Sequence, residues 1–154
     1  MSQPAKPPRP DASTLALVPD EEIVLRRVPP SAYDSGAQPD QRLLPAVFST
    51  EDFKPSSDSY GASCYVESKL LPGGIKALVD ADPKWAICGL IRVTVGALKA
   101  FHVSVYYTPM DCDHDDPTLK HAHGSFVGIG DRSNRNRLVQ FLQDYVTPPP
   151  NTGV

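Results

Sequence analysis

The chain lacks a hydrophobic segment long enough to cross a membrane. Residues 85–107 come nearest, but Arg92, Lys99 and His102 interrupt them, and a spanning helix needs about 18 or more apolar residues in a row. The N-terminal residues are polar and rich in proline, without the apolar centre of a secretory signal peptide. The sequence therefore predicts neither a membrane span nor a secretory leader.

Cysteine is scarce, and Cys64, Cys88 and Cys112 are the three examples. An odd number of cysteines without regular spacing is not the pattern of a secreted disulfide framework. Free thiols suit a reducing compartment better. We therefore expect a cytoplasmic protein.

Charge of one sign is not in large excess. Lysine and arginine number 15 against 18 aspartates and glutamates, which gives a formal net charge of −3. No overall positive field attracts the chain to nucleic acid or to an anionic membrane. Any binding of nucleic acid would have to be local.

Prolines are numerous, and many of the 17 lie near the two ends. Proline-rich segments favour an extended, solvated backbone that cannot form regular hydrogen bonds. A chain of 154 residues also suits one domain. We therefore predict a disordered N-terminal segment over 1–20, a single domain over 21–146 and a disordered tail over 147–154.

Hydrophobic periodicity predicts an α+β fold: a mainly antiparallel sheet of four to six strands, with a C-terminal helix packed on it and one short helix. The short helix is expected near 74–81, where Ile75, Leu78 and Val79 have helical spacing. The last helix is expected from Ser133 to Tyr145, capped by Ser133 or Asp131. The predicted strands are Glu22–Val28, Ser63–Glu67, Trp85–Val95, Phe101–Tyr107 and His121–Ile129.

Four residues late in the chain are candidates for a metal site. His121 and His123 would share one face of the last predicted strand. Cys112 and His114, or a carboxylate of the acidic loop Thr108–Lys120, could complete a zinc or iron site. The alternative is a solvated acidic loop, with one histidine hydrogen-bonded in the core.

Three arginines, Arg132, Arg135 and Arg137, are candidates for anion binding. They follow a glycine-flanked turn at the start of the last helix, where cations oppose the helix dipole unless an anion is near. A phosphate, a nucleotide or a nucleic acid would suit them. The alternative is that the arginines are solvated, or that the acidic loop at 111–116 neutralises them.

Two short patterns resemble known catalytic families. His102-Val103-Ser104-Val105 and His123-Gly124-Ser125-Phe126 resemble the paired motifs of two-histidine phosphoesterases, but they lie too close together for that two-lobed fold. Arg26 or Arg27, then Phe48-Ser49-Thr50, then Glu67 follow the order found in ADP-ribosyltransferases. The spacings are compressed, and the glutamate lacks the partner residue usual in that family.

A looser resemblance covers residues 22–146. The early Arg-Arg-Val-Pro-Pro, the Ser-Cys-Tyr-Val-Glu segment, the run from Gly89 to Leu98, Asp116-Pro117 and the strand that begins His121-Ala122-His123 are similar to those of small uncharacterised bacterial proteins. This resemblance implies a bacterial protein with one cytoplasmic domain, and no activity.

No complete catalytic constellation is present, so we assign no catalytic residue and no cofactor, with zinc as the alternative. We expect a non-enzymatic protein-binding or accessory component of a bacterial assembly, with another protein as partner. The oligomeric state is left open. The alternatives are a metal-dependent hydrolase or nuclease that uses His121 and His123, and a nucleotide or nucleic-acid binder that uses the three arginines.

Overall fold

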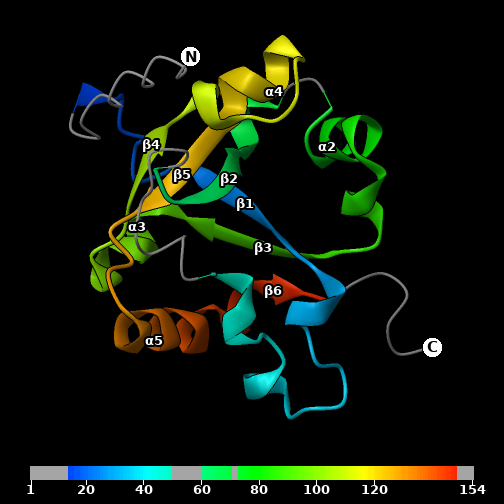
Figure 1. Ribbon diagram of the computed structural model, residues 1–154, viewed down its shortest axis with the longest axis vertical. Coiled ribbons are helices and arrows are strands. Elements are labelled where there is room, and N and C mark those ends of the chain that lie inside the picture. The colour runs from blue at the N-terminus through cyan, green and yellow to red at the C-terminus, as the bar shows by residue number, and fades with distance from the viewer. Residues whose placement is uncertain (1–13, 50–59, 71–72, 149–154) are drawn as a thin grey trace, which may run out of the picture.

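The computed structural model describes residues 14–49, 60–70 and 73–148. The sheet has six strands, and Figure 1 shows helices around it. This arrangement confirms the predicted α+β class. All neighbouring strands are antiparallel. In spatial order they are β4 (Ser104–Tyr107), β5 (His123–Val127), β2 (Ala62–Val66), β1 (Ile23–Val28), β3 (Gly89–Thr94) and β6 (Val146–Thr147).

Helices cover the two faces of the sheet. The larger core cluster lies on one face, where Leu138 and Leu142 of α5 pack with strand residues. The smaller cluster lies on the other face and includes Leu78 of α2 and Leu119 of α4. The α-helices are α2 (Ile75–Ala81), α3 (Val95–Leu98), α4 (Pro117–Ala122) and α5 (Arg132–Leu142).

Strand alternation divides β1 between these two cores. Val24 and Val28 belong to the larger cluster, whereas Leu25 belongs to the smaller one. Successive side chains of a strand point to opposite faces, so Arg26 and Arg27 leave β1 on opposite sides of the sheet. The two guanidinium groups therefore leave the strand on opposite faces, although both line the same cleft.

The chain before β1 covers an edge of the sheet. Val18 N–H donates to Val105 O at 2.9 Å, and Tyr107 N–H donates to Ala16 O at 2.9 Å. These bonds satisfy backbone groups of β4 that would otherwise form an open edge. Residues 14–18 are therefore ordered against β4, and the predicted boundary at residue 21 is too late. The remaining predicted disorder, 1–13 and 149–154, lies outside the described residues.

Two predicted strands begin later than expected. Trp85 lies in a 3-10 turn, Pro83–Ala86, which Asp82 caps by accepting a hydrogen bond from Lys84 N–H, so β3 starts only at Gly89. Phe101 ends another 3-10 turn and His102 has a left-handed φ of 60°. β4 therefore starts at Ser104.

The predicted strand His121–Ile129 is helical at its start. Asp116 accepts hydrogen bonds from Thr118 and Leu119 N–H, and Pro117 occupies the first turn, so α4 forms and ends at Ala122. The Asp116-Pro117 pair is a helix-start signal, which the strand prediction did not use. The cap predicted for α5 is confirmed, because Asp131 accepts from Asn134 N–H at 2.8 Å. Within the described residues no helix has the length and apolar character to span a membrane.

Candidate functional site

The sheet opens between its two central strands. β1 and β2 share only two residue pairs, Val24 with Val66 and Leu25 with Tyr65. Beyond them β1 stays paired to β3 as far as Val28, and β2 stays paired to β5 back to Ala62. The two strands therefore separate, and a cleft with a volume of about 380 Å³ lies at this fork.

Side chains from six parts of the chain line the cleft. Their shared feature is polarity: arginines, histidines, serines and aspartates surround two aromatic rings. The residues that matter below are Arg26 and Arg27 of β1, Ser63 and Tyr65 of β2, His123 of β5, Asp82 and Trp85 around the 3-10 turn before β3, Ser49, and Asp113 and His114 between β4 and α4. A cleft of this size and mixed lining suits a small organic ligand.

Arg26 closes one end of the cleft. Its Nη1 donates to Ser63 O at 2.7 Å and its Nη2 donates to Val47 O at 2.5 Å. The guanidinium carbon lies 4.8 Å from the centre of the Phe48 ring. Arg26 therefore links β2 to the segment before residue 50 across the gap that the strands leave, and it adds a positive charge there.

Arg27 is held more loosely. Its Nη1 lies 3.4 Å from Asp82 Oδ2, and its guanidinium carbon lies 5.9 Å from the centre of the Trp85 ring. The Arg27 side chain is 35% exposed. A guanidinium has five N–H donors, so this one long contact leaves most of them for a ligand in the cleft.

His123 is fixed in one orientation. Its Nδ1 lies 2.8 Å from Thr108 O and 3.0 Å from Thr108 Oγ1, and Thr108 Oγ1 lies 2.7 Å from Ser125 Oγ. A carbonyl oxygen only accepts, so Nδ1 carries the hydrogen in the neutral ring. Nε2 is then the unprotonated nitrogen, and it has no hydrogen bond within the described part of the chain.

Burial keeps the His123 ring neutral. The residue is 2% exposed, and this desolvation lowers the pKa of the imidazole below its ordinary value. The hydrogen bond to the Thr108 backbone and the charges of Asp111 and Asp113 act in the opposite direction, without reversing the shift. A neutral ring with Nε2 unprotonated is the form that accepts a proton or a hydrogen bond.

Tyr65 forms the aromatic centre of the site. Its ring meets His123 edge to face at a centroid distance of 5.2 Å, and meets Trp85 in the same manner at 5.8 Å. Its hydroxyl lies 3.7 Å from Cys112 Sγ. Burial raises the pKa of Tyr65 above its ordinary value, so the phenol stays neutral. Arg27, Trp85, Tyr65 and His123 thus lie in a row in which each side chain contacts the next.

The predicted metal ligands are only partly brought together. His114 and His123 both line the cleft, but His121 lies in the last turn of α4 and is exposed. Cys112 is buried against the Tyr65 hydroxyl. The prediction that His121 and His123 share one strand face is wrong, because the chain is helical at His121. The described residues contain no group of three or more histidine, cysteine or acidic side chains placed to hold a metal ion.

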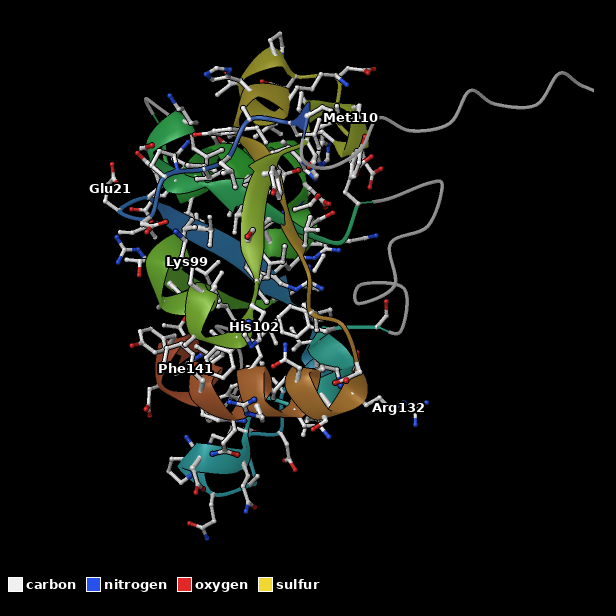
Figure 2. The ribbon with its side chains drawn as sticks, turned by 90° about the vertical axis from the view of Figure 1, so that its left-hand side faces the viewer. Glu21, Lys99, His102, Met110, Arg132 and Phe141 are labelled. Atoms are coloured by element: carbon white, nitrogen blue, oxygen red, sulfur yellow. The ribbon has the colours of Figure 1, made fainter. Side chains whose placement is uncertain are left out.

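The predicted anion site lies elsewhere. Arg137 lies over the Phe101 ring at 5.8 Å, and Arg135 donates to Asn136 Oδ1. Figure 2 shows Arg132 at the opposite end of the molecule from Met110, which adjoins the acidic loop. That loop therefore does not neutralise the arginines, and the helix start they flank already carries the Asp131 carboxylate as its cap.

The structure places the residues of the two catalytic resemblances at several separate sites. Arg26, Arg27 and Ser49 of the ADP-ribosyltransferase order line the cleft, whereas Glu67 is paired with Arg92 through two hydrogen bonds of 2.7 and 2.8 Å. His102 lines a separate hollow beside the start of α5 (Figure 2). His102 and His123 therefore do not form a catalytic pair in one site.

Sequence reasoning missed most of the cleft. Trp85 was assigned to a strand, and Asp82 and Thr108 were given no role. Two signals were available: consecutive arginines on a strand place one charge on each sheet face, and Asp82-Pro83 is a cap before a turn. No family model matches the sequence, and neither the curated proteins nor the solved structures contain a match to it. A function for this chain therefore rests on the geometry of the cleft.

Proposed function

We propose that the cleft between β1 and β2 binds a phosphate-bearing nucleotide. The observation that carries this proposal is the Arg27 guanidinium, which lines the cleft and whose hydrogen-bonding partner among the described residues is Asp82, at 3.4 Å. The planar guanidinium of arginine can bind two oxygens of one phosphate through parallel hydrogen bonds. The guanidinium carbon also lies 5.9 Å from the centre of the Trp85 ring, which places it beside an aromatic wall of the cleft.

The remainder of the lining suits the rest of a nucleotide. Ser63 and the unprotonated Nε2 of His123 offer partners for ribose hydroxyls, and Trp85 and Tyr65 offer apolar surface beside them. A ligand site of this kind combines apolar walls with a few convergent polar groups. The size of the cleft, about 380 Å³, falls within the range of small-molecule sites.

ADP-ribosyl transfer is a second candidate, because Arg26, Arg27 and Ser49 share the cleft. This activity would need a nicotinamide dinucleotide as substrate. The position of Glu67 counts against it, since the Glu67 carboxylate is bound to Arg92 and does not line the cleft. Release of nicotinamide from the dinucleotide would distinguish this candidate from nucleotide binding alone.

The protein-binding role in a bacterial cytoplasm remains a prediction from the sequence. Its expected mark is a large exposed apolar patch. The exposed large hydrophobic residues of the described chain come from separate elements: Leu17, Ile75, Ile87, Met110 and Tyr145. Nucleic-acid binding through Arg132, Arg135 and Arg137 also remains a prediction, and it requires affinity that falls steeply with salt.

Isothermal titration calorimetry with AMP, adenosine and NAD tests the proposal. We expect NAD to bind to one site per chain, and AMP, a phosphate monoester, and adenosine to bind more weakly. Arg27→Gln removes the charge and the guanidinium donors while keeping a polar side chain, and it should weaken binding by about tenfold or more, as expected for a charge-assisted hydrogen bond of about 1.5–3 kcal/mol.

Arg132→Gln is the matched control, because it removes an exposed arginine outside the cleft. It should leave the affinity unchanged. Binding that depends on Arg132 and not on Arg27 would move the site to the start of α5. Absence of binding by every phosphate-bearing ligand in the panel would overturn the proposal.

A further inference from the structure

The charges around the cleft select among phosphate groups. Two arginines, Arg26 and Arg27, and two aspartates, Asp82 and Asp113, line it, so their formal charges cancel when the histidines are neutral. A dianionic phosphate monoester would meet both carboxylates with little net attraction. A phosphodiester carries a single negative charge per phosphate, which one guanidinium neutralises. The balance of charge therefore favours a nucleotide whose phosphate is a diester.

The orientation of His123 gives this binding site a proton-accepting nitrogen, Nε2. Thr108 O accepts from Nδ1 at 2.8 Å, and the Thr108 and Ser125 hydroxyls support the same side of the ring. The ring lines the cleft, and Nε2 has no hydrogen-bond partner among residues 14–49, 60–70 and 73–148. A fixed base whose second nitrogen is anchored to the backbone is the usual arrangement of a histidine that removes a proton from water or a hydroxyl.

We propose that His123 is the proton acceptor in the hydrolysis of a nucleotide phosphodiester bound in this cleft. Nε2 takes a proton from water as the water oxygen bonds to phosphorus. The phosphorus–oxygen ester bond on the opposite side of the phosphorus breaks, the leaving oxygen takes a proton from solvent, and the imidazolium later releases its proton to solvent. Arg27 holds a non-bridging oxygen and neutralises the charge that grows on it. The products are a nucleotide monoester and an alcohol.

This inference rests on the proposed nucleotide site, so binding and turnover are measured separately. The substrate is adenylyl-uridine dinucleoside monophosphate, with 2′,3′-cyclic AMP and NAD as further probes. Calorimetry gives the affinity, and chromatography with mass detection gives the products. The wild-type protein should bind and cleave a phosphodiester. In water labelled with heavy oxygen, the label should appear in the phosphate product, as attack at phosphorus requires.

His123→Asn is the decisive variant. An asparagine amide can still donate to Thr108 O, but it has no group in place of Nε2 that accepts a proton. We expect kcat to fall by about 100-fold or more, with affinity within about threefold of the wild type. The matched control is His121→Asn, two residues away on the exposed side of α4, which should leave both quantities unchanged.

Each other result contradicts the inference. Binding without turnover overturns hydrolysis and leaves the nucleotide site standing, whereas no binding removes both. Full activity in His123→Asn overturns the role of the histidine. Nicotinamide release from NAD without phosphodiester cleavage replaces the reaction with glycosyl transfer. If His123→Asn does not fold, the pH profile of kcat/KM in the wild type takes its place: a rate that falls as pH drops below the ordinary histidine value of about 6.5 supports the base, whereas a rate independent of pH, label in the alcohol product, or no product overturns the inference.

Discussion

The guanidinium of Arg26 donates a 2.7 Å hydrogen bond to the carbonyl oxygen of Ser63 at the point where β1 and β2 cease to pair. The other end of the same guanidinium holds Val47 O. One side chain thus replaces part of the missing strand pairing and keeps the fork open at a fixed width. The cleft exists because these two strands separate while each remains paired to its other neighbour.

Replacing Arg26 should therefore affect both stability and the cleft. Arg26→Gln cannot reach both carbonyl oxygens, so we expect a loss of about 1.5–3 kcal/mol in the free energy of unfolding and weaker nucleotide binding. Urea unfolding and calorimetry measure the two effects. Arg42→Gln is the control, because Arg42 Nε donates a 3.1 Å hydrogen bond to the nearby Ala37 O, and losing this short-range bond should cost less than about 1 kcal/mol. Equal effects in the two variants would contradict the role given to Arg26.

Glu67 should contribute to stability through an ion pair at the surface and should have no role in ligand binding at the cleft. Its hydrogen bonds to Arg92 lower the pKa of the carboxyl, so the pair stabilises the fold at neutral pH and the benefit is lost as pH falls below the ordinary value of the carboxyl. The two side chains are 32% and 54% exposed, so Glu67→Gln should cost at most about 1 kcal/mol.

Nucleotide binding and any turnover should be unchanged in Glu67→Gln. Chemical unfolding and the assays described above measure this. A large loss of activity in a folded Glu67→Gln protein would instead favour ADP-ribosyl transfer, in which the sequence resemblance includes Glu67.

Gly61 occupies a position that admits no side chain. A Cβ there would lie 1.9 Å from the backbone oxygen of Phe126 on the neighbouring strand β5. Because backbone cannot move aside cheaply, Gly61→Ala should destabilise the protein by about 2 kcal/mol or more. Gly36→Ala is the control, since its nearest neighbour is an Asp34 side-chain oxygen at 3.4 Å. Similar melting temperatures for the two variants would show that β2 and β5 do not approach so closely.

The His123 imidazole should make stability depend on pH. Burial lowers its folded-state pKa below the unfolded value of about 6.5. Between these two values the unfolded chain binds more protons, so the free energy of unfolding falls as pH falls below about 6.5. Above that pH the histidine has no such effect.

Urea unfolding measures the free energy of unfolding at about pH 7.5 and at about pH 5.5. The difference between these two free energies should be smaller in His123→Asn than in the wild type, whereas His121→Asn should retain it. The carboxylates titrate at lower pH, so the interval isolates the histidines. An unchanged difference in His123→Asn would mean that this ring is not buried in its neutral form.

Much of the fold follows from local patterns. The predicted strands Glu22–Val28 and Ser63–Glu67 overlap β1 and β2, whose side chains alternate between the two cores. The helix predicted from Ser133 to Tyr145 overlaps α5. These features depend on a few neighbouring residues, and periodicity reports them directly.

The cleft was not predictable in the same manner. It depends on where the β1–β2 ladder ends, and no residue in either strand marks that point. Thr108 and His123 are 15 residues apart in sequence, and their hydrogen bond forms only because β4 and β5 pair. The metal prediction failed at His121 for a local reason, since the Asp116 cap starts a helix that rotates His121 away from His123.

The most direct test of the nucleotide site uses the fluorescence of Trp85, which is the single tryptophan of the chain and lines the cleft between Arg27 and Tyr65. Titration with a dinucleoside monophosphate should change the Trp85 emission until it saturates. The dissociation constant from this titration should equal the one from calorimetry, and it should be larger in Arg27→Gln. An emission spectrum that stays constant while calorimetry records binding would place the ligand away from Trp85 and contradict the account.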